Sequence, residues 1–451
     1  MIKSYRNLGR RFQFYNPEKI EGRQNIFTVI VGKNGSGKST LLGSLVRDLL
    51  GVQNSKKLYK GPELGFEHIE KGKVVTTKKP KEIISVSTSP FDKFPFVRHS
   101  LAVSNYSYLG LRDLHGSNFG LAYLSKIIAS LIQSVFENPT TAIGKVLNYL
   151  GYHDIISIRF DLSMTKGMLE DLVYYLNDNS QDFPRRRGSL RRLNMRYFCN
   201  EEDEVDLAKV EYLIQVAERI FNHKIPKLFE LEINSRGFEM NHFDMKLSED
   251  LILLIQSGMI RLRDVGIRSL EDSRLFSIRD ASSGEQSVIL SILGIASAIR
   301  DYSVICIDEP EICLHPQWQE RYIQLLISTF SSFKSCHFII ATHSPQIISR
   351  LNARNCFIMT MEDGHAFDAK GYIKHSADFQ LAKLFDSPGY KNEFLSRIAL
   401  NIFSKVSKNK SFDKEDLQNL ELLKYQSNFL DKKDPVYELI GSINELFQIY
   451  G

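Results

Sequence analysis

Hydrophobic residues along this chain follow two different periods, and their alternation predicts strands separated by helices. Residues 26–31, IFTVIV, form a continuous β-prone run, which is typical of a strand buried on both faces of a parallel sheet. The loop GKNGSGKST follows, and then apolar residues recur at helical spacing over 41–50 until Gly51. The first fifty residues are therefore predicted to fold as strand, glycine-rich loop and helix.

The same strand pattern returns later in the chain. A helix carrying Trp318 and Tyr322 is predicted between two of these later strands, because its apolar residues recur at helical spacing. The further predicted strands are 82–87 (EIISVS), 303–307 (SVICI), 337–342 (HFIIAT) and 356–361 (CFIMTM).

The stretch between the two groups of strands has a different character. Amphipathic helices are predicted over 121–136 and 203–221, and an alternating strand over 228–234. The last 75 or so residues are charged and helical in pattern. We therefore expect an α/β fold in four parts: 1–95 and 276–375 as the two halves of one sheet domain, 96–275 as a large, mostly helical inserted lobe, and 376–451 as a helical C-terminal region.

Composition restricts the class of protein. The 451 residues are 43% hydrophobic and 25% charged, which argues against a disordered or fibrous chain. A formal net charge of +5 permits an acidic partner such as nucleic acid without requiring one. The N-terminus has charges where a signal peptide would be apolar, and no apolar run reaches 18 residues, so we expect a cytoplasmic protein with no membrane partner. Five cysteines without a CxxC pair are expected to be reduced thiols: Cys199, Cys306, Cys313, Cys336 and Cys356.

The glycine-rich loop satisfies the phosphate-loop pattern G-x-x-x-x-G-K-[ST]. Phosphates need several N–H donors that converge at a helix N-terminus, and the glycines allow the backbone to wrap around them. Lys38 is predicted to neutralise the β- and γ-phosphates of ATP, and Ser39 to join the shell of a Mg²⁺ ion. The predicted phosphate-binding residues are Gly32, Lys33, Asn34, Gly35, Ser36, Gly37, Lys38, Ser39 and Thr40.

Two acidic residues and a histidine follow later strands, where ligands bind in open α/β sheets. Asp308 is predicted to hold Mg²⁺ together with Ser39, and Glu309 to polarise the attacking water as general base. His343 is the predicted γ-phosphate sensor. By themselves, two acids after a strand indicate a helix-capping turn and a lone histidine indicates a loop residue; the phosphate loop favours the catalytic interpretation.

A polar ASSGEQ segment precedes a helix that is apolar almost all the way round. Ser283 and Gln286 have the spacing of a capping box, but capping leaves Gly284 unexplained. Because glycine in the first turn lowers helix stability, we expect Gly284 to permit close approach of the backbone to a ligand.

The phosphate loop, SSGEQ, IDEPE..LHP and THSP, in this order around an inserted lobe, resemble an ABC-class ATPase of the overcoming-lysogenization-defect (OLD) and chromosome-maintenance (SMC) branch. The resemblance implies an ABC-type P-loop NTPase sheet core. It also implies composite sites in a homodimer or larger assembly, where the signature closes over the γ-phosphate of ATP held by a second copy. The signature residues are Ser282, Ser283, Gly284, Glu285 and Gln286.

Two positions depart from that class. The stretch SVSTSPFDKFP lacks the usual glutamine, and Ser89 or Asp92 are the candidate substitutes. His315 stands where transporters have an aspartate, as in the defence-type branch.

The finer resemblance is to the PtuA-like ATPase subunit of Septu and retron-associated antiphage systems. It is carried by SVSTSPFDKFP and by MIRLRDVGIRSLEDSRLFSIRDASSGEQS, together with the helical C-terminal region. OLD nucleases carry a metal-binding TOPRIM domain after the THS strand. In this chain Glu362 is available there but no Asp-x-Asp follows it, so the resemblance implies no nuclease activity of the chain's own. The resemblance implies a separate HNH nuclease subunit (PtuB-like) as partner and, in a retron, a reverse transcriptase and an RNA–DNA hybrid.

Two alternative hypotheses about the function remain open. An SMC-like DNA-repair clamp without a nuclease partner is opposed by the lack of a long heptad pattern. The ATP-binding subunit of a membrane transporter is opposed by the inserted lobe and the EPE..LHP pattern.

The segment PRRRGSLRRLNMR, residues 184–196, is a candidate contact surface. It is expected to meet nucleic-acid phosphates or an acidic partner, and a solvated loop without a partner is equally compatible. The C-terminal helices are similarly compatible with docking the nuclease or with packing on the ATPase core. The candidate arginines are Arg185, Arg186, Arg187, Arg191, Arg192 and Arg196.

Overall fold

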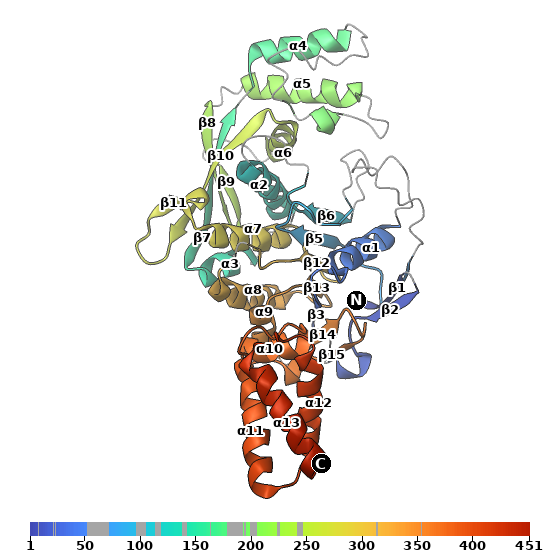
Figure 1. The fold of residues 1–451 in the computed structure, drawn as a ribbon. Coiled ribbons are helices and arrows are strands. Elements are labelled where there is room, and N and C mark those ends of the chain that lie inside the picture. Colours follow the sequence, from blue (N-terminus) through green and yellow to red (C-terminus); the bar gives the residue numbers. More distant parts are fainter. Residues whose placement is uncertain are drawn as a thin grey trace.

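A seven-stranded sheet lies at the centre of the computed structural model (Figure 1). The structure describes the whole chain except residues 8, 21, 23, 52–71, 96–104, 113–118, 138–141, 163, 178–192, 194, 199–204, 223–225, 241–246, 313 and 353. The strand order is β15-β14-β3-β13-β12-β5-β6, and every neighbouring pair is parallel except β14 with β15. The strands are β3 (Ile26–Val31), β5 (Ile83–Ser87), β6 (Tyr106–Leu109), β12 (Val304–Asp308), β13 (His337–Ala341), β14 (Cys356–Thr360) and β15 (Ala366–Asp368).

The predicted strands of this sheet are confirmed. All residues of β3, β5, β12 and β13 are buried, because layers cover both faces of the sheet. Alternate residues enter different cores: Val29 and Ile307 face one, and Ile30 and Cys306 the other. Since these four strands are parallel, their carboxyl ends meet at one edge, where a ligand is expected.

Helix α1 (Lys38–Leu50) packs on one face of the sheet together with a small antiparallel sheet of order β2-β1-β4. This small sheet, formed by β1 (Ile2–Asn7), β2 (Arg10–Gln13) and β4 (Lys73–Thr76), was not predicted. Its strands are short and only partly buried, so they carry no long apolar run. Helix α1 ends at Gly51, as expected, with φ of 68° in the left-handed region.

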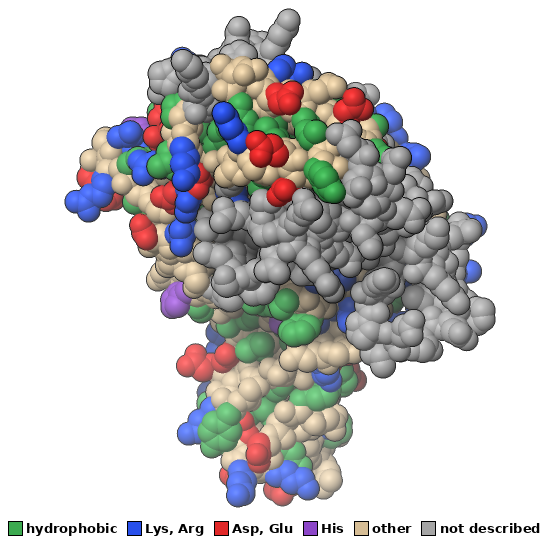
Figure 2. All heavy atoms as spheres, turned by 90° about the horizontal axis from the view of Figure 1, so that it is seen from above, with side chains coloured by type: hydrophobic (Ala, Val, Ile, Leu, Met, Phe, Trp, Pro, Cys, Tyr) green, Lys and Arg blue, Asp and Glu red, His purple; other side chains and the backbone are tan. Residues whose placement is uncertain are grey.

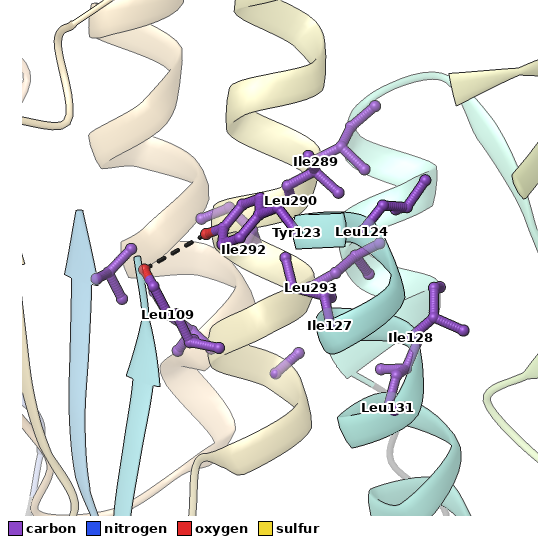
Figure 3. Close-up of a cluster of buried hydrophobic side chains, with 14 of the residues drawn as sticks. Leu109, Tyr123, Leu124, Ile127, Ile128, Leu131, Ile289, Leu290, Ile292 and Leu293 are labelled. Atoms are coloured by element: carbon purple, nitrogen blue, oxygen red, sulfur yellow. Dashed lines mark hydrogen bonds between the residues drawn. The ribbon is translucent and has the colours of Figure 1, made fainter. Parts of the chain in front are cut away.

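The opposite face is covered by α7 (Ser283–Ala298), α8 (Pro316–Thr329) and α2 (Phe119–Glu137). Figure 3 shows α2 against α7, with Leu124 and Ile127 of α2 in the same apolar cluster as Leu290 and Leu293 of α7. Tyr123 adds a hydrogen bond from its hydroxyl to the carbonyl of Leu109, at 3.4 Å. The inserted lobe and the sheet domain therefore share one continuous hydrophobic core.

The inserted lobe contains a five-stranded antiparallel sheet as well as helices, with strand order β11-β10-β7-β8-β9. Only β8 (Leu228–Asn234) was predicted. The others are β7 (Tyr152–Leu162), β9 (Gly237–Met240), β10 (Ile260–Ser269) and β11 (Leu275–Ser277). The helices of the lobe are α2, α3 (Ala142–Tyr149), α4 (Lys166–Asn177), α5 (Leu207–Asn222) and α6 (Leu247–Ser257), and α2 and α5 match the two predicted helices.

Strand β6 extends the central sheet past the predicted boundary at residue 95. It pairs in parallel with β5, although it lies in the segment expected to be the inserted lobe. The sequence YSYL is short and is interrupted by Ser107, so this edge strand lacks the continuous apolar run that revealed the central strands.

The C-terminal region is helical, as predicted, and has a hydrophobic core of its own. It comprises α10 (Ala377–Leu384), α11 (Glu393–Asn409), α12 (Lys414–Ser427) and α13 (Pro435–Tyr450). Figure 1 shows these helices as a bundle at the end of the molecule opposite α4 and α5. In the described part of the chain, no helix combines the length and apolarity needed to cross a membrane.

Two helical glycines predict opposite effects of the same substitution. A Cβ at Gly43 in α1 would lie 2.2 Å from the carbonyl oxygen of Lys93, whereas one at Gly441 in α13 would meet nothing within 4 Å. Alanine gains about 1 kcal/mol in a helix, but overpacking against backbone costs about 1–3 kcal/mol. In urea unfolding, we expect Gly43→Ala to lower the free energy of unfolding and Gly441→Ala to raise it; a gain for Gly43→Ala would contradict the packing of α1.

Candidate functional site

The phosphate loop connects β3 to α1 at the carboxyl edge of the central sheet. Gly35 and Gly37 have φ of 77° and 93°, left-handed values that favour glycine. The ammonium of Lys38 donates to the carbonyls of Gly32 and Lys33, at 2.9 and 3.2 Å. Burial lowers the pKa of Lys38, and the carboxylates of Glu309, Glu311 and Asp308 oppose that shift.

The loop has the donors that a phosphate chain requires. The hydroxyl oxygen of Ser36 is buried and has no hydrogen-bond partner within the described residues. The ammonium of Lys38 is directed at carbonyls of its own loop. Phosphate oxygens would accept from both groups, so these residues fit the β- and γ-phosphates of ATP.

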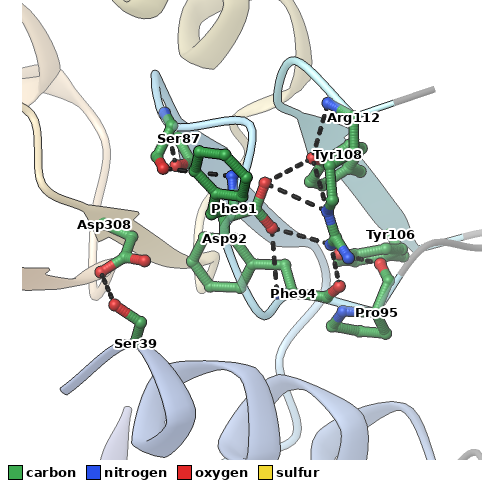
Figure 4. A network of polar contacts seen from close by, with 11 residues as sticks. Ser39, Ser87, Phe91, Asp92, Phe94, Pro95, Tyr106, Tyr108, Arg112 and Asp308 are labelled. Atoms are coloured by element: carbon green, nitrogen blue, oxygen red, sulfur yellow. Dashed lines mark hydrogen bonds and ion pairs between the residues drawn. The ribbon is translucent and has the colours of Figure 1, made fainter. Parts of the chain in front are cut away.

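A buried carboxylate lies beside the start of α1. The Ser39 hydroxyl donates to Asp308 Oδ1 at 3.0 Å, and Figure 4 shows the two side chains facing each other from α1 and β12. Asp308 is 2% exposed. Burial raises its pKa to about 7; the Ser39 hydrogen bond opposes this, and the carboxylates of Glu309, Asp92 and Glu311 add to it. A hydroxyl and a carboxylate in a cluster of acids are suitable ligands for Mg²⁺.

His343 joins the same cluster from the end of β13. Its Nε2 lies 3.5 Å from Glu309 Oε1, and its Nδ1 lies 3.4 Å from the ammonium of Lys38. Burial, followed by the charge of Lys38, lowers the pKa of His343 to about 4, so the ring is neutral at physiological pH. Because an ammonium only donates, Nδ1 accepts from Lys38, and Nε2 carries the proton toward Glu309.

The backbone in this cluster is constrained. Glu309 has φ of 49°, a left-handed value that is uncommon for a residue with a side chain and is found at functional sites. Glu311, to which the sequence assigned no role, accepts from the backbone N–H of His343 at 2.5 Å through Oε1. Its Oε2 is buried without a partner among the described residues. The second glutamate of IDEPE was its only signal in the sequence.

The signature segment begins α7, but the expected cap was assigned one residue too late. Ser282, not Ser283, is the N-cap: its side chain accepts from the N–H of Glu285, whose carboxylate accepts from the N–H of Ser282. Ser283 is the first helical residue and is exposed. Gln286 donates to the carbonyl of Ala281 at 2.8 Å and does not take part in the box.

Within the described residues, no hydrogen bond or ion pair joins the signature to the phosphate loop. Ser282 and Glu285 bond to each other, while Gln286 bonds to the turn before α7. The exposed Ser283 therefore remains available to another molecule. That its ligand is ATP held by a second copy stays a prediction.

The loop after β5 contains Ser89 and Asp92, the two candidate substitutes for the missing glutamine, and the structure shows what each side chain contacts. Asp92 accepts from the hydroxyl of Tyr108 at 2.7 Å and pairs with the guanidinium of Arg112 at 2.7 Å (Figure 4). These bonds direct Asp92 toward β6, so its side chain anchors the loop. Ser89 accepts from the N–H of Phe91 at 3.2 Å. Neither side chain forms a hydrogen bond with Ser39 or Asp308 within the described residues.

The structure also gives the surroundings of His315 and of three of the cysteines. His315 is the N-cap of α8 and accepts from the N–H of Gln317 at 3.5 Å. Cys306, Cys336 and Cys356 are free and buried, as expected, whereas Cys199 and Cys313 lie outside the described residues.

The structure describes only one of the six candidate arginines. Arg185, Arg186, Arg187, Arg191 and Arg192 lie outside the described residues, and Arg196 lies in a 3-10 turn, Met195–Phe198. In the view from above, the described surface shows Lys and Arg side chains interspersed with Asp and Glu (Figure 2). Ion pairs on the inserted lobe fit this mixture, among them Arg219 with Asp250 at 3.0 Å.

Comparison with known proteins gives one family and several relatives. Residues 169–349 match the family described as "AAA domain, putative AbiEii toxin, Type IV TA system". The chain is 22% identical to "Retron Ec83 probable ATPase" of Escherichia coli, over 80% of this chain and 71% of that protein. It is 23% identical to "Endonuclease GajA" of Bacillus cereus, over 73% of this chain and 53% of that protein. The solved structure of the ATP-binding cassette MJ1267 in its ADP conformation is 13% identical, with 83% and 94% of the two chains covered and a TM-score of 0.26.

The raised pKa of Asp308 predicts how stability depends on pH. An unfolded aspartate has a pKa near 4, so between about pH 4 and pH 7 the folded protein without nucleotide binds a proton that the unfolded chain releases. Stability therefore falls as pH rises through this window. At pH 8 we expect Asp308→Asn to raise the free energy of unfolding by about 1–3 kcal/mol and to flatten the pH dependence.

Urea unfolding from pH 5 to pH 8 would measure this effect. The exposed Glu421 on α12 supplies the control, Glu421→Gln, which should leave the pH profile unchanged. Equal profiles for the wild type and Asp308→Asn would show that the Asp308 carboxyl is not the group that titrates.

Proposed function

We propose that the chain is an ABC-class ATPase, that it is the ATP-hydrolysing subunit of an antiphage defence complex, and that it controls a partner HNH nuclease. The observation that carries this proposal is the meeting of Lys38, Ser39, Asp308, Glu309 and His343 at the ends of three parallel strands. The relative named as a retron ATPase, aligned over most of both chains, supports the defence role.

The residues divide the chemistry among themselves. Lys38 and the loop N–H groups bind the phosphates, and Ser39 with Asp308 would hold Mg²⁺, which supplies positive charge opposite the phosphate oxygens. Glu309 polarises the attacking water as general base. The neutral His343 ring donates toward Glu309 and accepts from Lys38, so it orients the base relative to the phosphate-binding lysine.

The hydrolytic site is completed by a second copy of the chain. Ser283 is exposed at the N-terminus of α7, whereas Gly284, which follows it, is buried. The N-terminus of a helix favours an anion, and a serine hydroxyl can donate to it. ATP would therefore join two copies, and its hydrolysis would release them.

DNA cleavage is assigned to a separate subunit. The segment after β14 continues into β15 and the helices α10 to α13, and Glu362 has no Asp-x-Asp following it. In this proposal, ATP-dependent closure of the ATPase restrains or licenses the HNH nuclease, and in a retron the RNA–DNA hybrid and reverse transcriptase join the same complex.

Glu309→Gln separates ATP binding from hydrolysis. The amide keeps the size of the side chain but is a poor base, so we expect turnover to fall by about 10²–10⁴-fold while ATP still binds. Steady-state phosphate release and equilibrium ATP binding measure the two effects. Glu320→Gln is the matched control, because Glu320 pairs with Arg350 on the surface, at 2.7 Å. Unchanged turnover in Glu309→Gln would remove Glu309 from the mechanism.

Co-expression with the neighbouring genes tests the partner. We expect an HNH subunit to co-purify and its DNA cleavage to change with ATP, and to respond differently with Glu309→Gln. If the chain elutes alone and shows only ATP-dependent dimerisation or DNA binding, the proposed nuclease partner is contradicted. The function supported would then be that of an SMC-like DNA-binding clamp.

A further inference from the structure

The C-terminal helical region contacts the phosphate loop through Lys33. This lysine is distinct from Lys38, the lysine of the G-K-[ST] pattern. The ammonium of Lys33, the second residue of GKNGSGKST, lies 3.8 Å from Asp386 Oδ2. It also lies 4.0 Å from the centroid of the Phe429 ring. Asp386 follows α10 and Phe429 follows α12, so two separate parts of the C-terminal region meet at this one side chain.

Asp386 is held in position by its own region. The hydroxyl of Tyr425 donates to Oδ2 at 2.9 Å, and the amide of Gln426 donates to Oδ1 at 3.3 Å. The same amide donates to the carbonyl of Ala382, at 2.6 Å. The Asp386 side chain is 12% exposed, whereas that of Lys33 is 43% exposed. The carboxylate and the Phe429 ring therefore form a fixed receptor, into which the more exposed lysine reaches.

Lys33 also touches the phosphate-binding machinery, through its backbone. Its carbonyl accepts from the ammonium of Lys38 at 3.2 Å and from the N–H of Ser36 at 3.2 Å. The Ser36 hydroxyl and the Lys38 ammonium are the two loop groups that we expect to donate to phosphate oxygens. Lys33 thus connects the C-terminal region directly to the loop that receives ATP.

We infer that Asp386 and Phe429 position Lys33 in the phosphate loop, so that seating of the C-terminal region and binding of nucleotide are energetically coupled. The coupling is reciprocal: nucleotide that favours the seated loop also favours the seated C-terminal helices. A partner that moves these helices would thereby change the affinity for ATP. The inference rests on ATP binding at the phosphate loop, and it does not require the nuclease partner.

The sign of the coupling follows from the charges. With Lys33 present, the Asp386 carboxylate is neutralised. With Lys33→Met, the carboxylate stays in place on its two neutral donors and leaves an uncompensated negative charge beside the phosphate loop, which disfavours an anionic ligand there. Lys33→Met should therefore weaken nucleotide binding, and Asp386→Asn in the same chain should restore it.

A double-mutant cycle tests the inference with ADP and Mg²⁺, which occupy the loop without turnover. We expect Lys33→Met to raise the dissociation constant of ADP by about two- to five-fold, the size expected for a partly exposed charge pair, and Lys33→Met with Asp386→Asn to return it to the wild-type value. Asparagine suits position 386 because its φ of 47° is left-handed, a conformation that asparagine tolerates. The accompanying ATPase assay should show the change in KM with little change in kcat.

Two controls separate a specific contact from general damage. Glu421→Gln removes an exposed carboxylate of α12 and should give no rescue of Lys33→Met. Phe429→Leu keeps every charge and removes only the ring under the ammonium, so it should weaken ADP binding in the wild type and have no effect in the Lys33→Met chain.

Hydrogen exchange gives a second readout of the same coupling. Nucleotide should slow exchange in α10 and α12 of the wild type, and less so in Lys33→Met. Additive effects of Lys33→Met and Asp386→Asn on ADP affinity, or exchange in α10 and α12 that ignores nucleotide, would overturn the inference while leaving the ATPase intact. Failure of the wild type to bind nucleotide would instead overturn the function on which the inference rests.

Discussion

The contact between Ser39 and Asp308 is the interaction on which the rest of the site depends. It joins the first residues of α1 to the end of β12, and so fixes the phosphate loop against the acidic edge of the sheet. Asp308 is buried, near other carboxylates, and has a pKa raised to about 7. A group in this state lowers the stability of the protein unless a cation joins it. Repulsion and burial at Asp308 therefore lower the stability of the nucleotide-free fold. Binding of Mg²⁺ with ATP would remove this destabilisation and so would favour the closed arrangement of the site.

Two attachments connect that site to the rest of the molecule. Helix α7 begins with the exposed signature and continues into the core that it shares with α2 of the inserted lobe (Figure 3). The C-terminal region reaches the phosphate loop through Lys33. Packed side chains therefore connect the nucleotide site to the inserted lobe, and a polar contact connects it to the C-terminal helices.

The central sheet and its site could be predicted because their signals are local. Buried parallel strands give continuous apolar runs, and Asp308, Glu309 and His343 lie at or just after the ends of two of these runs. The antiparallel sheet of the inserted lobe was missed, apart from β8, because its pairings join distant segments, as β7 pairs with β10. The cap at Ser282 was misplaced by one residue, since Ser282 and Ser283 are equally suited by type and only the backbone distinguishes them. The ion pair of Asp92 with Arg112, and the hydrogen bond that Glu311 accepts from the N–H of His343, join residues far apart in the sequence. No local sequence pattern indicates such contacts.

The central claim is an ATP site completed by a second copy of the chain, and mixing two inactive variants tests it most directly. Lys38→Ala disables the phosphate loop, and Ser283→Arg blocks the exposed signature position. In a mixed dimer, one of the two sites would combine an intact loop with an intact signature. The account predicts that each variant alone lacks ATPase activity and that an equimolar mixture regains about one quarter of the wild-type rate per chain. A mixture with no more activity than the two variants measured apart would contradict it.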